Sequence, residues 1–285
     1  MPDTTDTVTA TEPDAAPASA PFASLILPIH NQADHIDRVI SGFLADFAKL
    51  DRACELVLVP NGCHDASPQI CAAWAARLPE LVQNVELERG GWGRAINAGL
   101  AVARGEVVGF TNSARTRPET ATLMLAYAIA YPDTALKASR RIRESALRRA
   151  GSVLYNFECR RLFDLATWDI DGTPKFFPRR FHHLLELDSE AELYDLAWMR
   201  ACRYAGYPVV EIPIYPTERF GGRSSTNLRT AARMLLGAYR MRGSLHSAPP
   251  GGAPPEAERH PAGEPHVSGM STRPPAARDR GRFAG

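Results

Sequence analysis

Residues 89–119 read RGGWGRAINAGLAVARGEVVGFTNSARTRPE, and they combine a glycine loop, a predicted helix and a predicted strand in one unbroken run. Three glycines between residues 90 and 93 form a loop in which the backbone can turn tightly and approach a ligand. Apolar residues then recur at helical spacing from Ala95 to Val102, and Gly105 is placed to cap that helix. The apolar run 107–110 predicts a buried strand. Together they indicate a ligand-binding α/β crossover unit.

Polar residues follow the predicted strand directly. Because ligands of such sheets bind beyond the carboxyl ends of the strands, we expect Thr111, Asn112, Ser113 and Ala114 to lie at the functional site.

The same alternation of strand and helix extends on both sides of this unit. Before it, the pattern predicts strands at 24–28, 55–59 and 82–87, a helix at 36–47 and a second helix that Asp65 or Ser67 caps and that runs through Trp74. After it, we expect helices at 120–130, 151–165, 193–204 and 228–242, strands at 134–139 and 209–214, and a turn-rich loop at 168–179 that runs into a short strand. The sequence therefore predicts a Rossmann-like α/β domain with a mostly parallel sheet flanked by helices.

The composition sets the limits of this domain. A chain of 285 residues that is 45% hydrophobic can bury a full core, and we expect one folded domain from residue 21 to residue 243. Residues 1–20 and 244–285 are rich in Pro, Ala, Gly and polar residues with few large apolar side chains, so we expect both tails to be disordered.

The charge balance, the cysteines and the hydropathy indicate which partners and which cellular compartment to expect. The 33 basic and 32 acidic residues give no overall field that favours nucleic acid. Five cysteines without a framework spacing fit a reducing compartment. No segment reaches the roughly 18 to 20 apolar residues of a membrane helix, so we expect a cytoplasmic protein that is at most peripheral to a membrane.

A basic stretch begins within the predicted strand at 134–139 and continues past it. Its members are Lys137, Arg140, Arg141, Arg143, Arg148 and Arg149, with Glu144 as the only acidic residue among them. The stretch is either a solvated helix face or a phosphate-binding surface beside the predicted ligand site.

Six motifs in the right order resemble the family 2 glycosyltransferases of GT-A fold, and within them the dolichyl- and polyprenyl-phosphate sugar synthases. The resemblance covers about residues 24–225. The motifs are the opening strand and loop at 24–31, the second strand and turn at 56–65, the glycine loop and helix start at 91–100, the loop of Asp, Gly, Lys, Phe and Arg at 169–179, the late strand at 206–213, and Arg219 with Ser224.

The resemblance implies transfer of a sugar from a nucleotide diphosphate sugar to an acceptor, with no nucleic acid involved. The positions that match the donor-binding motifs are Pro28, His30, Asn31, Asn61, Asp65, Arg94, Asn112 and Ala114. Those that match acceptor or phosphate binding are Ser139, Arg140, Arg179 and Arg219. The acceptor is left open between a polyprenyl phosphate at a membrane surface, a glycan and a small molecule.

The sequence departs from the family where a metal would bind. Asn112, Ser113 and Ala114 stand in place of the family's Asp-x-Asp, which holds a divalent cation on the nucleotide diphosphate. Asn61 and Gln32 likewise replace acidic residues, and His30 replaces a tyrosine. Because Mg²⁺ and Mn²⁺ prefer anionic oxygen ligands, we expect weakened metal binding and leave the cofactor open.

Two interpretations follow. In the first, which we favour, the enzyme is active and cations such as Arg94, Arg115, Arg117, Arg140 or Lys175 replace the metal charge around the diphosphate. In the second, the fold is a catalytically inactive nucleotide-sugar-binding or scaffold module. A nucleotidyltransferase is disfavoured, because the loop after the first strand is not glycine-rich and basic.

The expected reaction is an inverting in-line displacement, as in the family's inverting members. The candidate catalytic residues are Asp171, Lys175 and Asp195. A phosphate acceptor is already anionic and needs no general base, whereas a hydroxyl acceptor needs a carboxylate to take its proton. Asp171 is the first candidate for that base and Asp195 the second.

Overall fold

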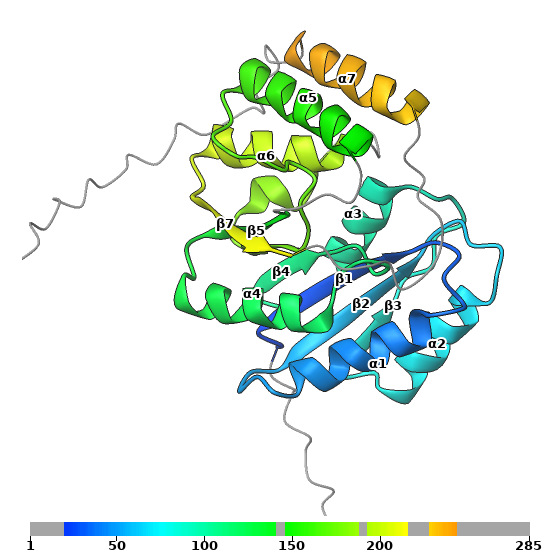
Figure 1. Cartoon of the computed structure of the whole chain (residues 1–285). Coiled ribbons are helices and arrows are strands. Elements are labelled where there is room, and N and C mark those ends of the chain that lie inside the picture. Colours follow the sequence, from blue (N-terminus) through cyan, green and yellow to red (C-terminus); the bar gives the residue numbers. More distant parts are fainter. Residues whose placement is uncertain (1–19, 141–145, 188–192, 216–227, 244–285) are drawn as a thin grey trace, which may run out of the picture. The chain divides into compact units, whose positions relative to one another are not determined.

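The structure, a computed structural model, describes residues 20–140, 146–187, 193–215 and 228–243. The described strands form one seven-stranded sheet in the order β3-β2-β1-β4-β6-β5-β7 (Figure 1). Its strands are β1 (Ala23–Ile29), β2 (Cys54–Pro60), β3 (Val82–Asn84), β4 (Val107–Phe110), β5 (Ala135–Arg140), β6 (Lys175–Pro178) and β7 (Val209–Ile214). All neighbours pair in parallel except β6, which is antiparallel to both β4 and β5. The predicted mostly parallel α/β sheet is confirmed.

Helices connect the strands. They are α1 (Ile36–Phe47), α2 (Ser67–Arg77), α3 (Trp92–Val102), α4 (Pro118–Ala130), α5 (Ala146–Phe163), α6 (Tyr194–Ala205) and α7 (Leu228–Gly243), with a short 3₁₀ turn at His182–Leu184. Figure 1 shows α1, α2 and α4 in front of the strands and α5 beside α7 at the top.

Successive side chains along each strand point to opposite faces of the sheet, so a separate hydrophobic core forms on each face. Leu25 and Leu27 of β1 pack with α1, α2 and α4, whereas Ile26 between them packs with α3, α5 and α6. Every residue of β1, β2 and β4 is buried, as expected of central strands covered on both faces. This double cover fixes the strand ends, where the loops of the site begin.

Three details differ from the sequence prediction. β3 ends at Asn84, although Val85 N still donates to Leu58 O at 2.9 Å beyond it. α5 begins at Ala146 rather than residue 151. Gly105 does not cap α3, which ends at Val102. A Cβ at Gly105 would lie 2.5 Å from Ser24 N, so glycine is needed there for close passage beside β1.

All five cysteines are free, as predicted. Among the described residues, no helix is long and apolar enough to cross a membrane. The predicted tails at 1–20 and 244–285 fall, apart from residue 20, outside the described residues.

Candidate active site

The loops that follow β1 and β2 are joined by the side chain of Asn61. Its Nδ2 donates to Ile29 O at 2.9 Å and to Val59 O at 3.1 Å, and its Oδ1 accepts from Gly91 N at 3.0 Å. Asn61 is only 4% exposed. The amide therefore fixes two strand ends and the glycine loop in place. Asn61 thus supports the site structurally, and its predicted contact with the nucleotide stays a prediction.

His30 and Asn31 occupy the outer side of the same loops, and both are exposed. His30 Nδ1 lies 2.8 Å from Asn61 O, and Asn31 Oδ1 accepts from His64 N at 2.8 Å. These two side chains present polar atoms toward solvent above buried Pro28.

Asp65 ties the loop after β1 to the start of α2. Its carboxylate accepts from Ala33 N at 2.9 Å and from Ser67 N at 3.0 Å. Burial opposes ionisation, but the hydrogen bonds from Ser67 and Ala33 outweigh it and hold the pKa of Asp65 below its usual range. Asp65 is thus a charged brace between two loops of the site.

The glycine loop places Arg94 at the start of α3. Gly91 has φ +154°, and Gly62 has φ +58° with its missing Cβ position only 2.5 Å from Gly90 N, so the two turns pack backbone against backbone. Arg94 Nη1 donates to Gly90 O at 2.8 Å, and the residue is exposed. An exposed guanidinium beside the first-turn N–H groups of a helix suits an anion.

The turn after β4 does not suit a divalent metal. Asn112 Oδ1 accepts from Ala114 N at 3.1 Å, and Ser113 Oγ lies 3.0 Å from Pro28 O and 2.9 Å from Gln32 Oε1. The Asn112 oxygen already accepts a hydrogen bond, Ser113 is buried, and Ala114 offers no side-chain oxygen. In the described part of the chain, no group of three or more His, Cys, Asp or Glu side chains is placed to hold a metal ion. The residues present do not fit the family's metal.

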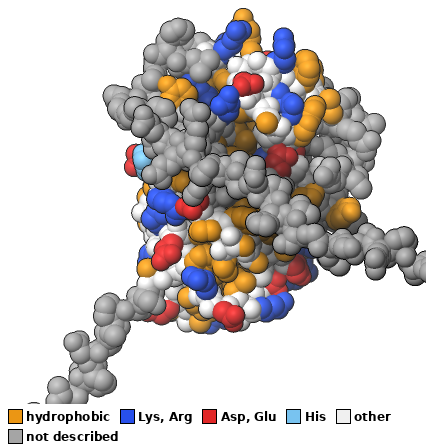
Figure 2. Space-filling model, turned by 90° about the vertical axis from the view of Figure 1, so that its left-hand side faces the viewer, with side chains coloured by type: hydrophobic (Ala, Val, Ile, Leu, Met, Phe, Trp, Pro, Cys, Tyr) orange, Lys and Arg blue, Asp and Glu red, His pale blue; other side chains and the backbone are white. Residues whose placement is uncertain are grey.

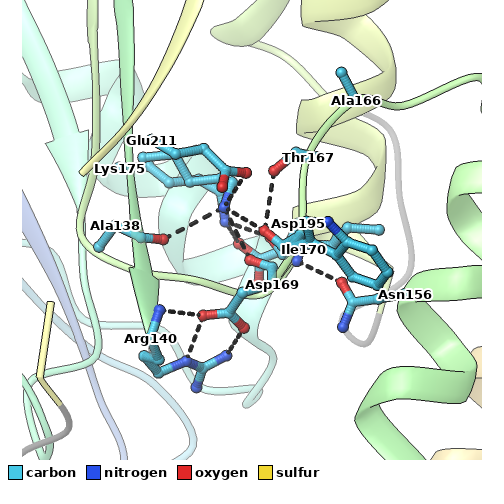
Figure 3. A network of polar contacts seen from close by, with 12 residues as sticks. Ala138, Arg140, Asn156, Ala166, Thr167, Asp169, Ile170, Lys175, Asp195 and Glu211 are labelled. Atoms are coloured by element: carbon cyan, nitrogen blue, oxygen red, sulfur yellow. Dashed lines mark hydrogen bonds and ion pairs between the residues drawn. The ribbon is translucent and has the colours of Figure 1, made fainter. Parts of the chain in front are cut away.

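Seven charged residues gather around β5, β6 and the loop between α5 and β6, and Figure 3 shows five of them: Arg140, Asp169, Lys175, Asp195 and Glu211. We call this group the charged cluster, and it consists of Lys137, Arg140, Asp169, Asp171, Lys175, Asp195 and Glu211. Lys175 is fully buried and donates to Asp195 Oδ1 and, at 3.1 Å, to Ile170 O. Trp92 Nε1 donates to Asp195 Oδ2 at 3.2 Å. Asp195 at the start of α6 is therefore linked to both β6 and α3.

Arg140 and Lys137 fix the loop that carries Asp169. Asp169 has φ +55°, and its carboxylate accepts from Arg140 N at 2.8 Å, Nε at 2.8 Å and Nη2 at 2.5 Å. Lys137 Nζ donates to the carbonyls of Trp168 and Asp169, each at 3.0 Å, and pairs with Glu211 at 3.2 Å. From α5, Asn156 Oδ1 accepts from Ile170 N at 2.9 Å. Side chains from β5, β6 and α5 therefore fix this loop.

Asp171 follows these fixed residues and is half-buried. Burial, and then the neighbouring charge of Asp195, raise its pKa to about 6, while Arg140 and Lys175 act in the opposite direction. A carboxyl group with this pKa can take or give a proton near neutral pH.

The structure brings most of the predicted residues to the carboxyl edge of the sheet, including half-buried Ser139 and Arg140 at the end of β5. Arg179 is the exception. Because β6 is antiparallel, Lys175 pairs with Phe110 at the site, whereas Arg179 lies beyond the opposite edge. There its side chain donates to Gly105 O at 2.8 Å and to Ala103 O. Arg219 lies outside the described residues.

The buried position of Lys137 and the structural roles of Asp169 and Asn156 differ from the sequence prediction or were not part of it. Lys137 was grouped with a basic stretch, yet it is fully buried in β5. Lys137 lies among Ala135, Leu136 and Ala138 in a predicted strand, and these small and apolar neighbours indicate burial. Nothing in the sequence signals that Asn156 reaches Ile170.

Known proteins resemble this chain in sequence. A family model described as glycosyl transferase family 2 matches residues 24–185. An undecaprenyl-phosphate 4-deoxy-4-formamido-L-arabinose transferase of Shewanella sediminis is 31% identical over 137 residues, 47% of this chain and 41% of that protein. The minor teichoic acid biosynthesis protein GgaA of Bacillus subtilis is 30% identical over 92 residues, 32% of this chain and 21% of that protein. The matches thus span less than half the length of these curated relatives.

Solved structures share the fold. Glucosyl-3-phosphoglycerate synthase from Mycobacterium tuberculosis, with Mn²⁺, UDP-glucose and glycerol 3-phosphate, has a TM-score of 0.59 at 16% identity and covers 78% of this chain and 80% of its own. The mannosyltransferase PcManGT from Pyrobaculum calidifontis, with GDP-Man and Mn²⁺, has a TM-score of 0.54 at 21% identity and covers 84% of this chain and 67% of its own. These likenesses show the GT-A fold.

Proposed function

Since the chain belongs to glycosyl transferase family 2, we propose that it moves a sugar from a nucleotide diphosphate sugar to a polyprenyl-phosphate lipid. One observation carries the proposal. The loops of β1, β2 and β4, the start of α3 and the charged cluster all meet at one edge of the sheet. A donor and an acceptor bound at this edge would lie beside each other, as a direct transfer requires.

The donor half of the site is the group of loops around His30, Asn31 and Arg94. Arg94 and the first-turn N–H groups of α3 would bind the diphosphate and stabilise the charge that develops as it leaves. The bond between the sugar's anomeric carbon and the diphosphate oxygen breaks, and the nucleoside diphosphate departs with the electron pair. Because the turn at Asn112–Ala114 does not fit a metal, arginine is the expected source of positive charge.

The acceptor half is the charged cluster. Ser139 and Arg140 lie at the end of β5, and 27% of the Arg140 side chain is exposed beside the carboxylate of Asp169. An acceptor phosphate is already anionic near neutral pH, so its oxygen can attack the anomeric carbon without a general base. The names of the undecaprenyl-phosphate relatives support this acceptor class.

A second candidate acceptor is a hydroxyl group, and Asp171 favours it. In this case the half-buried carboxylate takes the proton as the hydroxyl oxygen attacks, and a pKa of about 6 suits that role. Asp195 is less suited, because Lys175 and Trp92 already occupy its two oxygens.

A transfer assay with one variant separates the two acceptors. The full chain is incubated with each of a panel of UDP- and GDP-sugars and either a short-chain polyprenyl phosphate or a panel of hydroxyl acceptors. For a phosphate acceptor, Asp171→Asn should keep at least about a third of the rate, because no base is lost. For a hydroxyl acceptor, the rate should fall about a hundredfold or more. Transfer to neither class, in folded protein, would contradict the proposed function.

A further inference from the structure

The outer faces of α5 and α7 expose large apolar side chains. Val153, Leu154 and Phe157 of α5 are each more than half exposed, as is Tyr239 of α7, and Leu236 is 50% exposed. The two helices pack against each other. We call these five residues the α5/α7 patch.

The helical period places the patch on the side that faces away from the core. Val153, Phe157 and Arg161 follow one another at intervals of four along α5, whereas Tyr155 and Cys159 on the opposite side are buried. On α7, Ala238 is fully buried. The side chains of the patch therefore do not contribute to the hydrophobic core of the domain.

The two helices that carry the patch are rich in arginine. By sequence α5 contains four arginines and one glutamate, and α7 contains four arginines and no acidic residue. Arg161 and Arg240 are exposed on the same faces as the apolar residues. In Figure 2, hydrophobic and basic side chains are interspersed at the top of the molecule, where Figure 1 places α5 and α7. The whole chain has a net charge of only +1, so this helix pair concentrates its positive charge.

Interspersed apolar, aromatic and arginine side chains on the outer face of a helix are typical of proteins that lie on anionic lipid. We propose that the α5/α7 patch docks the protein on the surface of an anionic bilayer. The apolar side chains enter the boundary between headgroups and acyl chains, and the arginines contact lipid phosphates.

The patch is also close to the acceptor half of the site. Tyr155, Asn156 and Cys159 form the buried side of α5, and Asn156 bonds directly to Ile170 of the loop that carries Asp171. Only the thickness of α5, about 10 Å, separates this loop from the outer face. The inference rests on the proposed function in one respect: a lipid acceptor in the docked bilayer would be delivered beside the charged cluster.

Vesicle sedimentation of the full chain tests the proposal without donor or acceptor. We expect the protein to pellet with vesicles of equimolar phosphatidylglycerol and phosphatidylcholine, and weakly with phosphatidylcholine alone. Salt should weaken the binding, because it screens the arginines. The double variant Leu154→Ser/Phe157→Ser should lower the partition coefficient at least about tenfold. Arg161→Glu/Arg240→Glu should lower it similarly.

The matched control is Leu123→Ser/Tyr127→Ser on α4, which removes comparably exposed apolar side chains elsewhere and should leave binding unchanged. Circular dichroism confirms that each variant is folded. The proposal is overturned if the folded wild type does not pellet with anionic vesicles, or if the α5 variant binds as well as wild type. It is also overturned if sedimentation velocity shows that the α5 variant dissociates a dimer, since the patch would then join two copies.

A second assay keeps the two proposals apart. With a short-chain polyprenyl phosphate in detergent, Leu154→Ser/Phe157→Ser should transfer sugar as fast as wild type, because neither residue lies in the site. Vesicle binding without transfer to the dissolved acceptor would support the docking surface and contradict the lipid-phosphate function. Transfer without vesicle binding would support the lipid-phosphate function and contradict the docking surface.

Discussion

The Nζ atom of Lys137 lies 3.0 Å from the carbonyl oxygen of Asp169, and the lysine is fully buried. The ammonium also binds Trp168 O and pairs with Glu211. A lysine is tolerated inside a sheet here because these groups compensate its charge. The contact joins β5 to the loop that carries Asp171, so the core of the fold and the candidate site depend on one side chain.

Replacement of Lys137 should therefore destabilise the fold. Lys137→Met leaves Glu211 and two carbonyls without their shared donor, and we expect the free energy of unfolding to fall by about 3–5 kcal/mol. Urea unfolding followed by circular dichroism measures it. Arg203→Met, which removes an exposed ion pair with Asp164, is the control and should cost less than about 1 kcal/mol. Equal losses in the two variants would show that the buried lysine has no special role.

Asp171 should make stability depend on pH. Its pKa is about 6 in the folded protein and about 4 in the unfolded chain. The folded state thus binds more protons between these values, and this group lowers the free energy of unfolding as pH rises through the window. Asp171→Asn should stabilise the protein more at pH 7 than at pH 4. Guanidinium unfolding at both pH values measures the difference, with exposed Asp51→Asn as control. A gain independent of pH would contradict the assignment.

Replacement of Asn61 by the aspartate that the family carries at this position should lower the free energy of unfolding. In Asn61→Asp a carboxylate oxygen would face the carbonyls of Ile29 and Val59, which now accept hydrogen bonds from Nδ2. We expect a loss of at least about 2 kcal/mol in the free energy of unfolding. Asn31→Asp, at an exposed amide of the neighbouring loop, should cost less than about 1 kcal/mol. If Asn61→Asp is as stable as wild type, the amide is not the brace that the geometry indicates.

Arg94 should contribute to donor affinity. Arg94→Ala removes the guanidinium at the start of α3, and the Kd for a nucleoside diphosphate should rise about tenfold, while the Kd for the nucleoside alone should not change. Isothermal titration calorimetry measures both constants, and Arg203→Ala is the control for loss of one exposed arginine. A parallel loss for nucleoside and diphosphate would mean that Arg94 does not contact the phosphates.

Most of the fold could be predicted from the sequence because its strands and helices have clear periods. The run around Ile26 and Val57 predicts strands buried on both faces, and the spacing of Ile36, Ile40 and Phe43 predicts α1. The boundaries agree within one or two residues there. At β3 the regular strand ends at Asn84, three residues earlier than predicted, although Leu87 N still donates to Pro60 O at 2.8 Å and Leu87 forms an isolated parallel bridge with Asn61.

The site was predicted less completely than the fold, because the sequence pattern does not indicate which side chains bond to each other. The polar residues after β1, β2 and β4 were expected at one edge, and they lie there. The motif at 169–179 treated Lys175 and Arg179 as one loop, but an antiparallel β6 carries them to opposite edges of the sheet. Asn61 has the right position for a nucleotide contact, yet three backbone groups occupy its amide.

We propose that this family 2 site binds a nucleotide diphosphate sugar with arginine in place of a metal held by carboxylates. Calorimetric titration of the full chain with UDP- and GDP-sugars, in EDTA and then in excess Mg²⁺ or Mn²⁺, tests it most directly. We expect at least one donor to bind in EDTA, with a Kd that changes less than about threefold when metal is added. Binding that appears only with metal, or no binding by folded protein to any donor, would contradict it.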